Sequence, residues 1–399
     1  MKRPNRLMRK SNPAQESETT MDARSARNGL NETKRLVIKV GSAVLANQET
    51  DVFSEIGKDI GTLMQEGREV TLVSSGAIAM GYPLLGYEQK PRDLPGLQAA
   101  AAMGQTHLMS RWNAALEKTG FQAAQILLTH ADLANRKRYL NARHVLHRLL
   151  AEHTLPIVNE NDTVSVDEIK VGDNDVLAAE ICGLVSASTM ILLTTADGFF
   201  TADPREDSTA KRIPVIDEFT NEMKSFVGQP SALGTGGMKT KLEAATLARK
   251  HGATTIIASG LEKNVISRIL NGEDVGTLVL NSGEPPEKAR KRWIAHTLRS
   301  QGVICVDQGA ARALRKNASL LFAGVKDVRG EFYVGDAVTI LESSTQKMLG
   351  KGLASMNHHD ARLVIGLRTE EARQKMGTPI PDELIHRDDL VLSTDDEEM

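Results

Sequence analysis

The stretch RLVIKVGSA, residues 35–43, gives the clearest indication of the fold in this sequence. Six residues, most of them apolar or β-branched, end at a glycine, which is typical of a strand buried on both faces of a sheet. Lys39 is the exception inside the apolar run, and a lysine buried without an anionic partner is energetically costly. We therefore expect Lys39 to contact either a structural carboxylate or a bound phosphate.

Further apolar runs of strand length alternate with helical periodicity along the first two thirds of the chain. Apolar residues recur at helical spacing from Ile56 to Met64, and longer helical patterns extend over about residues 96–118 and 139–153. Strands that alternate with helices predict a mainly parallel sheet with helices on both faces, which is an α/β fold of the three-layer αβα sandwich type. The additional strands are expected at residues 69–73, 155–158, 190–194 and 254–258.

Small, polar or acidic residues follow the ends of four of these strands. Ligands of open α/β sheets bind beyond the carboxyl ends of the strands. One such segment would be an ordinary turn, but four in register with four strands favour the rim of an active site. The segments are GSA (41–43), SSGA (74–77), NEND (159–162) and TTADG (194–198).

The sequence pattern changes after residue 280, where turn residues and a basic stretch lead into a second unit. Short apolar segments separated by glycine turns, from VICVD to ARLVIG (361–366), predict a small β-rich domain of barrel type. The first 33 residues are basic and are expected to be a disordered tail, although an organellar transit peptide could have the same composition. The expected boundaries are a catalytic domain at 34–285, a linker at 286–298, the β-rich domain at 299–394 and an acidic tail at 395–399.

Composition limits the class of protein. A chain of 399 residues predicts two domains, and a formal net charge of -2 gives no general attraction to nucleic acid or to anionic membranes. Two cysteines, Cys182 and Cys305, cannot form a disulfide framework, which favours a reducing, cytoplasmic location. No apolar run reaches the roughly 20 residues that a membrane helix needs, so no membrane partner is expected.

The stretch GTGGMKTK, residues 234–241, predicts an anion site. Glycines free the backbone N–H groups to turn inward, and a helical pattern begins near Lys239, so that a helix N-terminus would face the ligand. Lys239 and Lys241 add positive charge. The spacing fits neither the P-loop nor the dinucleotide fingerprint.

The stretch IKVGDND, residues 169–175, supplies acidic and amide side chains at a helix entrance. Phosphoryl transfer needs in-line positioning and positive charge on the migrating group more than covalent help. Two lysines could supply that charge if a carboxylate such as Asp175 held them in place. Asp173 and Asn174 could then hold the acceptor. Because no acidic pair suggests a dedicated metal cage, Mg²⁺ is expected to arrive with the nucleotide.

These motifs, in this order, resemble the glutamate 5-kinase family of the amino-acid kinase superfamily. KVGSAVL, SSGAIAMG, NENDTVS, IKVGDND, ADPR and GTGGMKTK carry the resemblance, and RKRWI with the β-rich unit resembles that family's appended PUA domain. The resemblance covers about residues 34–393. It implies ATP-dependent phosphorylation of the L-glutamate side-chain carboxylate to L-glutamyl 5-phosphate, the first step of proline biosynthesis.

The resemblance also implies partners and regulation. Family members are inhibited by proline at a site that overlaps the glutamate site and involves the loop at 162–175. A homo-oligomer, dimer or tetramer, and an association with glutamyl-phosphate reductase are expected. Because a carboxylate oxygen is already an adequate nucleophile, the reaction needs no general base.

By motif position, Lys39 and Lys241 match the two phosphate-stabilising lysines, and Asp175 matches the residue that organises them. Thr195 departs from the family, which often has aspartate there, and this bears on nucleotide binding. Gly41, Ser42 and Gly76 are expected to donate backbone N–H groups. The glutamate-binding positions implied are Ser75, Gly76, Asn159, Asp162, Asp173 and Asn174. The ATP-binding positions implied are Lys39, Gly41, Ser42, Thr194, Thr195, Thr235, Gly236, Gly237, Met238, Lys239, Thr240 and Lys241.

Two other functions are compatible with parts of the sequence. PUA domains occur in RNA-modifying enzymes, but residues 300–394 hold 12 Lys+Arg against 12 Asp+Glu, and RNA binding usually needs a basic surface. Within the superfamily, acetylglutamate kinase, aspartokinase and uridylate kinase act on other acceptors, and none combines IKVGDND with a PUA unit. The histidines of NHHD (357–360) are expected on a strand, where neighbouring side chains point to opposite faces and cannot easily share one metal ion, so a metal site is the less favoured interpretation.

Overall fold

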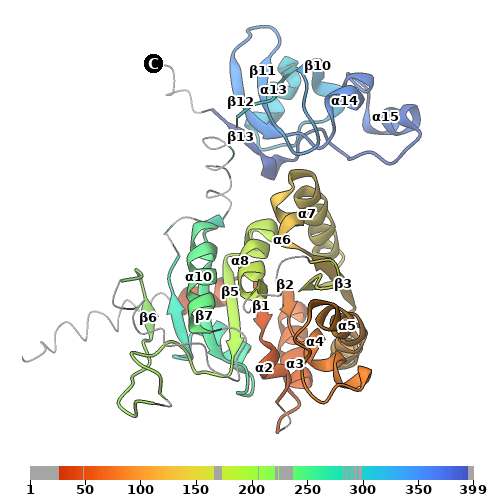
Figure 1. Cartoon of the computed structure of the whole chain (residues 1–399). Coiled ribbons are helices and arrows are strands. Elements are labelled where there is room, and N and C mark those ends of the chain that lie inside the picture. Colours follow the sequence, from red (N-terminus) through yellow and green to blue (C-terminus); the bar gives the residue numbers. More distant parts are fainter. Residues whose placement is uncertain are drawn as a thin grey trace, which may run out of the picture.

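The computed structural model describes residues 27–47, 49–165, 173–204, 206–220, 223, 237–281, 283, 285, 286, 288, 291, 294 and 299–393. Within these ranges the chain forms two units, each with its own sheet and its own hydrophobic core (Figure 1).

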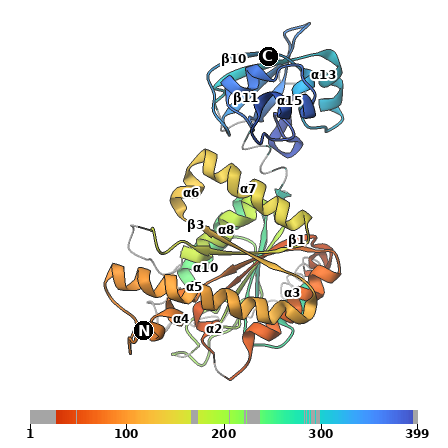
Figure 2. The same ribbon diagram turned by 90° about the vertical axis from the view of Figure 1, so that its right-hand side faces the viewer.

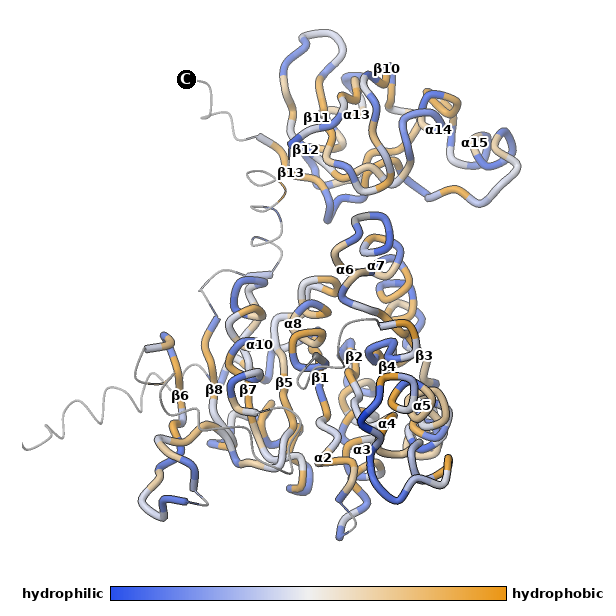
Figure 3. Tube along the Cα trace, in the orientation of Figure 1, coloured by the Kyte–Doolittle hydropathy of each residue, from blue (hydrophilic) through white to orange (hydrophobic). Residues whose placement is uncertain are grey.

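The first unit is built on an eight-stranded sheet with the order β3-β4-β2-β1-β5-β7-β8-β6. All strand pairs are parallel except β7 with β8, which confirms the predicted, mainly parallel sheet. In Figure 3 strands β5 and β8 are drawn mainly in the hydrophobic colours, as expected for strands covered on both faces. The strands are β1 (Arg35–Val40), β2 (Glu69–Ser74), β3 (Ala123–Leu128), β4 (Leu155–Glu160), β5 (Thr189–Thr194), β6 (Val215–Ile216), β7 (Thr254–Ser259) and β8 (Thr277–Val279).

Helices cover both faces of this sheet, so the predicted three-layer arrangement is confirmed (Figure 2). One face packs mainly against α3 (Val52–Gln65), α5 (Leu94–Leu116) and α11 (Val265–Leu270). The other packs against α7 (Arg136–Ala151), α8 (Asp173–Val185) and α10 (Met238–Lys250). The short helices are α2 (Ser42–Leu45), α4 (Ala77–Gly81) and α6 (His130–Ala134).

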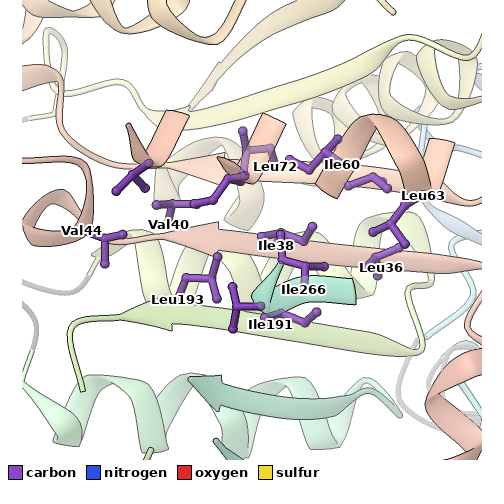
Figure 4. Close-up of a cluster of buried hydrophobic side chains, with 14 of the residues drawn as sticks. Leu36, Ile38, Val40, Val44, Ile60, Leu63, Leu72, Ile191, Leu193 and Ile266 are labelled. Atoms are coloured by element: carbon purple, nitrogen blue, oxygen red, sulfur yellow. The ribbon is translucent and has the colours of Figure 1, made fainter. Parts of the chain in front are cut away.

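Strand β1 shows how the sequence selects the two faces. Leu36, Ile38 and Val40 point into the core on the α3 side, as Figure 4 shows. Val37 lies in the opposite core, against α8 and α10. Because side chains alternate along a strand, Lys39 shares the face of Val37 and points toward α8 and α10.

Helices α4 and α5 approach so closely that their backbones are in contact. A Cβ atom added to Gly81 would lie 1.8 Å from the Ala100 carbonyl oxygen, and one added to Gly104 would lie 1.7 Å from the Ala77 carbonyl oxygen. No side chain larger than hydrogen fits at either position. Since α4 follows the end of β2 directly, this contact fixes α5 relative to the polar segment that begins at Ser75.

The second unit contains a five-stranded sheet with the order β10-β9-β11-β12-β13. Its core includes Phe322, Phe332 and Ile340. The predicted strand ARLVIG was wrong: it lies in α14 and the turn after it, and the NHHD histidines open that helix rather than a strand. The elements are β9 (Gly302–Val306), α13 (Gln308–Arg315), β10 (Val325–Gly330), β11 (Ala337–Glu342), β12 (Met348–Leu353), α14 (His358–Leu363), α15 (Thr369–Met376) and β13 (Leu390–Leu392).

Helix α7 joins the two units. The Arg143 guanidinium lies 2.7 Å from the Asp389 carboxylate and 3.8 Å from that of Asp388. The side chains of Arg143 and Asp389 are only 3% and 4% exposed. Beside them, Leu140 packs in one buried cluster with Leu353. An ion pair with no access to water strongly disfavours separation of its partners, because each would be left as an unpaired buried charge.

His147 ties α7 to α8 and should make stability depend on pH. Its Nε2 atom lies 3.1 Å from the Leu184 carbonyl oxygen, which makes the neutral ring a donor there. Burial, followed by the nearby charges of Arg143 and Arg35, lowers the pKa of His147 to about 4. Below about pH 6.5, His147 binds a proton in the unfolded chain but not in the folded chain. The free energy of unfolding therefore decreases as the pH falls, until the pH reaches the pKa of His147 in the folded chain.

We therefore expect the free energy of unfolding to fall by on the order of 2 kcal/mol between pH 7 and pH 5 because of His147 alone. In His147→Gln, whose amide can still donate to Leu184, this part of the decrease should be absent. Urea denaturation of both proteins at the two pH values measures the difference. Equal decreases in the two proteins would contradict the assignment.

Candidate active site

Two lysines and one aspartate converge at the carboxyl end of β1. The Lys39 Nζ atom lies 2.5 Å from Asp175 Oδ1, and the Lys241 Nζ atom lies 3.1 Å from Asp175 Oδ2. The Asp175 side chain is fully buried, and those of Lys39 and Lys241 are 7% and 6% exposed. Each carboxylate oxygen therefore holds one ammonium group, and the two ammonium groups flank a single anion.

Each of the three residues is placed by its own element. Lys39 occupies the last but one position of β1, whereas Asp175 and Lys241 lie in the first turns of α8 and α10. A carboxylate near a helix N-terminus is favourable, but a lysine there opposes the helix dipole. The first turn of α10 carries Lys239 and Lys241 and no acidic residue. This arrangement favours the binding of an additional anion.

The electrostatics of the cluster are consistent with that conclusion. Burial alone would raise the pKa of the Asp175 carboxyl, but Lys39 and Lys241 outweigh it and hold the pKa below its usual value. Burial lowers the pKa of Lys241, and the charge of Lys39 adds to that decrease while Asp175 opposes it. The three side chains together carry one net positive charge, and they lie almost closed to water.

Thr240 also contacts Asp175. Its hydroxyl lies 3.0 Å from Asp175 Oδ2 and 2.9 Å from the carbonyl oxygen of Gly237, the residue before α10. The sequence placed Thr240 and Gly237 among the ATP-binding positions; the structure places the Thr240 hydroxyl beside the carboxylate and the Gly237 carbonyl oxygen beside that hydroxyl. Of the other positions in this run, Met238 is half-buried, Lys239 is exposed and pairs with Glu243, and Thr235 and Gly236 lie outside the described residues.

A second group of polar side chains lies next to the charged cluster. Asn174, the neighbour of Asp175, donates from Nδ2 to Ser75 Oγ and to Asn159 Oδ1, both at 3.0 Å. Asn159 Nδ2 in turn donates to Gln105 Oε1 at 2.8 Å. We call Ser75, Asn174, Asn159 and Gln105 the amide chain. It begins after β2 and crosses to β4 and α5.

The remaining predicted positions surround these two groups. Gly76 has a φ of 108°, which favours glycine, and it opens α4. Asp162 is half-buried in the loop after β4, and Asp173 is the first residue of α8. Thr194 ends β5 and is half-buried, whereas Thr195 is exposed. Ser42 is the first residue of α2.

Gly41 lies between the end of β1 and the start of α2. Its N–H donates to the Leu193 carbonyl oxygen at 3.1 Å, so this donor is already used within the sheet. A Cβ atom at Gly41 would lie 3.7 Å from Lys39 Nζ. The position therefore lies next to the Lys39 ammonium group.

Gln105 was missed by the sequence analysis. It is 9% exposed, and it lies on a long helix whose glutamines would ordinarily be assigned to the surface. No local motif marks it, because the residue it meets, Asn159, lies on a strand elsewhere in the chain. It could have been identified only as an amide side chain on the face of α5 that packs toward β4, and that face is known only once the fold is known.

The described part of the chain offers neither a cluster of metal ligands nor a membrane-spanning helix. No group of three or more His, Cys, Asp or Glu residues is arranged to hold a metal ion there. Likewise, none of the helices in the ranges given above is both long and apolar enough to span a bilayer.

Comparisons with known proteins agree with the two units. The amino acid kinase family matches residues 34–259, and the PUA domain matches residues 302–376. A glutamate 5-kinase from Chromohalobacter salexigens is 42% identical over 373 residues, which are 92% of this chain and 98% of the relative. One from Azoarcus sp. is 44% identical over 374 residues, 92% of this chain and 100% of the relative. Among solved structures, a UMP kinase from Bacillus anthracis covers 63% of this chain and 97% of its own, with 19% identity and a TM-score of 0.44.

Proposed function

The chain belongs to the glutamate 5-kinase family of amino acid kinases, and from this premise we propose how its residues divide the reaction between them. The reaction is the ATP-dependent phosphorylation of the L-glutamate side-chain carboxylate, which begins proline biosynthesis. The observation that carries the assignment of roles is the buried cluster in which Asp175 holds Lys39 and Lys241 side by side.

The charged cluster acts on the migrating phosphoryl group. An oxygen of the glutamate carboxylate forms a bond to the γ-phosphorus, and the bond to the bridging oxygen breaks, so that its electron pair leaves with ADP. No proton has to move. Lys39 and Lys241 stabilise the negative charge on the phosphoryl oxygens, and Asp175 keeps both ammonium groups in position before the substrates arrive.

The nucleotide side is proposed to be formed by the start of α10, by Gly41 and Ser42, and by Thr194 and Thr195. Mg²⁺ is proposed to be carried by the nucleotide phosphates, whose charge it neutralises. The donors present fit that arrangement, since the carboxylate nearest the reaction, Asp175, is already engaged by two ammonium groups.

Ser75, Asn159 and Asn174 of the amide chain are proposed to bind glutamate, together with Gly76, Asp162 and Asp173. The amide and hydroxyl groups can donate to the α-carboxylate of the amino acid, and the two carboxylates can accept from its ammonium group. Proline, as a feedback inhibitor, is proposed to compete at this side of the site.

The wider setting rests on the family resemblance and on composition. We propose a homo-oligomer, an association with glutamyl-phosphate reductase that protects the labile acyl phosphate, and a cytoplasmic location. Cys182 and Cys305 are free, buried thiols, which suits a reducing compartment.

A substrate panel tests the acceptor. ADP release should be stimulated by L-glutamate and should stay at background with aspartate, acetylglutamate or UMP at equal concentrations. The assay is a coupled spectrophotometric measurement, with Lys241→Ala protein as the blank for contaminating ATPase activity. Turnover with one of the other acceptors, and none with glutamate, would refute the proposed substrate. Strong, salt-dependent retention of bulk RNA on a filter would instead favour RNA binding.

A further inference from the structure

We infer that Gln105 is a positioning residue for glutamate: it orients the amide chain through Asn159 and thereby sets the affinity for the acceptor but not for ATP. This inference rests on the proposed function, because it assumes that the amide chain binds glutamate. Nothing in the comparisons or the motifs points to Gln105.

The orientation of the chain is dictated by a backbone group. The Glu160 N–H donates to Asn159 Oδ1 at 2.9 Å and to Asn174 Oδ1 at 3.2 Å. A backbone N–H can only donate, so both asparagine oxygens must face it and both NH₂ groups must face away. The usual ambiguity between the oxygen and nitrogen of a side-chain amide is therefore removed for Asn159 and Asn174.

Gln105 is oriented in its turn by Asn159. Because Asn159 Nδ2 must donate, the group it meets at 2.8 Å must be the acceptor, Gln105 Oε1. The Gln105 Nε2 atom is buried and has no hydrogen-bond partner in the described part of the chain. Flipping the Gln105 amide would place two NH₂ groups against each other. An unpaired buried donor is costly, and Gln105 Oε1 is the acceptor that keeps the Asn159 NH₂ group from becoming one.

Helix α5 connects this contact to the other end of the amide chain. Gln98, two helical turns before Gln105, donates from Nε2 to the Ser165 carbonyl oxygen at 3.1 Å, beyond the end of β4. Gln98 and Gln105 are seven residues apart and therefore share one face of the helix. The same helix contacts α4 backbone to backbone at Gly104. It thus fixes the distance between Asn159 and Ser75.

A substitution at Gln105 should therefore change the Michaelis constant for glutamate without changing that for ATP. If Asn159 loses its acceptor, its NH₂ group is left buried without a partner, and only the bonds of Asn159 Oδ1 with the Glu160 N–H and Asn174 Nδ2 still hold the side chain, so a group that glutamate must meet is less well preorganised. The nucleotide contacts of the proposed site come from α10 and the ends of β1 and β5, which Gln105 does not touch. The Michaelis constant for glutamate should rise and that for ATP should not.

Steady-state kinetics of Gln105→Met test this. Methionine keeps the length of the side chain but cannot accept from Asn159. We expect the KM for glutamate to rise by about tenfold, with the KM for ATP within about twofold of wild type. Gln105→Asn, which is one methylene too short to reach Asn159, should give the same separation and serves if the methionine variant does not fold. Gln122→Met, the same change at an exposed position, is the matched control and should match wild type.

A double-mutant cycle with Asn159→Ala tests the route. If Gln105 acts through Asn159, then Gln105→Met should add no further increase in the KM for glutamate once Asn159 has been truncated. An unchanged KM for glutamate in the folded single variant, equal increases for both substrates, or additive effects in the cycle would overturn the inference. Absence of glutamate turnover in the wild-type enzyme would instead overturn the proposed function.

Discussion

Lys241→Ala is expected to lower kcat by about two orders of magnitude or more while leaving stability close to that of wild type. The substitution removes one of the two ammonium groups that face the migrating phosphoryl group, and nothing preorganised replaces it. Stability should change little, because Asp175 keeps Lys39 as a partner at 2.5 Å and the site becomes a neutral pair. The charge surplus of the three side chains is lost, but Asp175, the partner of Lys241 among the described residues, keeps a counter-charge.

Single-turnover rates at saturating ATP and glutamate, together with urea denaturation, measure the two effects. Lys250→Ala is the matched control, since Lys250 is an exposed lysine at the far end of the same helix. A near-wild-type rate for Lys241→Ala would show that the Lys241 ammonium group does not stabilise the migrating phosphoryl group.

Asp175→Asn is expected to damage catalysis and stability together. The isosteric amide leaves Lys39 and Lys241 buried without a counter-charge, and breaking a buried ion pair in this way costs roughly 3–5 kcal/mol. The lysines should also repel each other, so kcat should fall by about 10² or more. Because phosphate groups could supply the missing negative charge, ATP should raise the melting temperature of the variant by more than it raises that of wild type.

Thermal unfolding with and without ATP, followed by the same kinetic assay, measures these effects. Glu180→Gln, an equivalent neutralisation on the same helix away from the cluster, should leave kcat unchanged. If Asp175→Asn were as stable as wild type and gained no extra stability from ATP, Asp175 would not be the residue that holds the two lysines.

The two substitutions differ because the cluster contains an uneven number of charges. Removing a cation from two cations and an anion leaves a balanced pair, whereas removing the anion leaves two like charges in a site closed to water. A comparison of stability between the variants therefore reports the charge count of the site directly, independently of any assay of activity.

The sheet could be predicted from the sequence because its central strands carry a strong local signal. Runs such as RLVIKV are mostly apolar and β-branched, which is typical of a strand covered on both faces. Strand β3, AAQILL, was missed, because it lies at the edge of the sheet and begins with alanines, which strands disfavour. ARLVIG was assigned to a strand because a short apolar run does not distinguish a strand from a buried helical turn.

The charged residues of the site could be predicted because each lies in a local sequence motif. Lys39, Asp175 and Lys241 each lie in a segment with an unusual charge or glycine pattern, and the structure brings all three together. The role of the Gly41 N–H was not predictable, because its partner, Leu193, is on a different strand. Gln105 was missed for the same physical reason: its contact depends on how α5 packs across β4.

The buried pair of Arg143 and Asp389 has a practical consequence for protein engineering. Anyone who exchanges the C-terminal unit for that of a relative must bring across a carboxylate that reaches Arg143, or replace the arginine as well. A chimera without such a carboxylate would bury the Arg143 guanidinium without an anionic partner. Compatible recombination points in this architecture therefore depend on α7 and on the short 3-10 helix Arg387–Asp389 before β13, as well as on the linker.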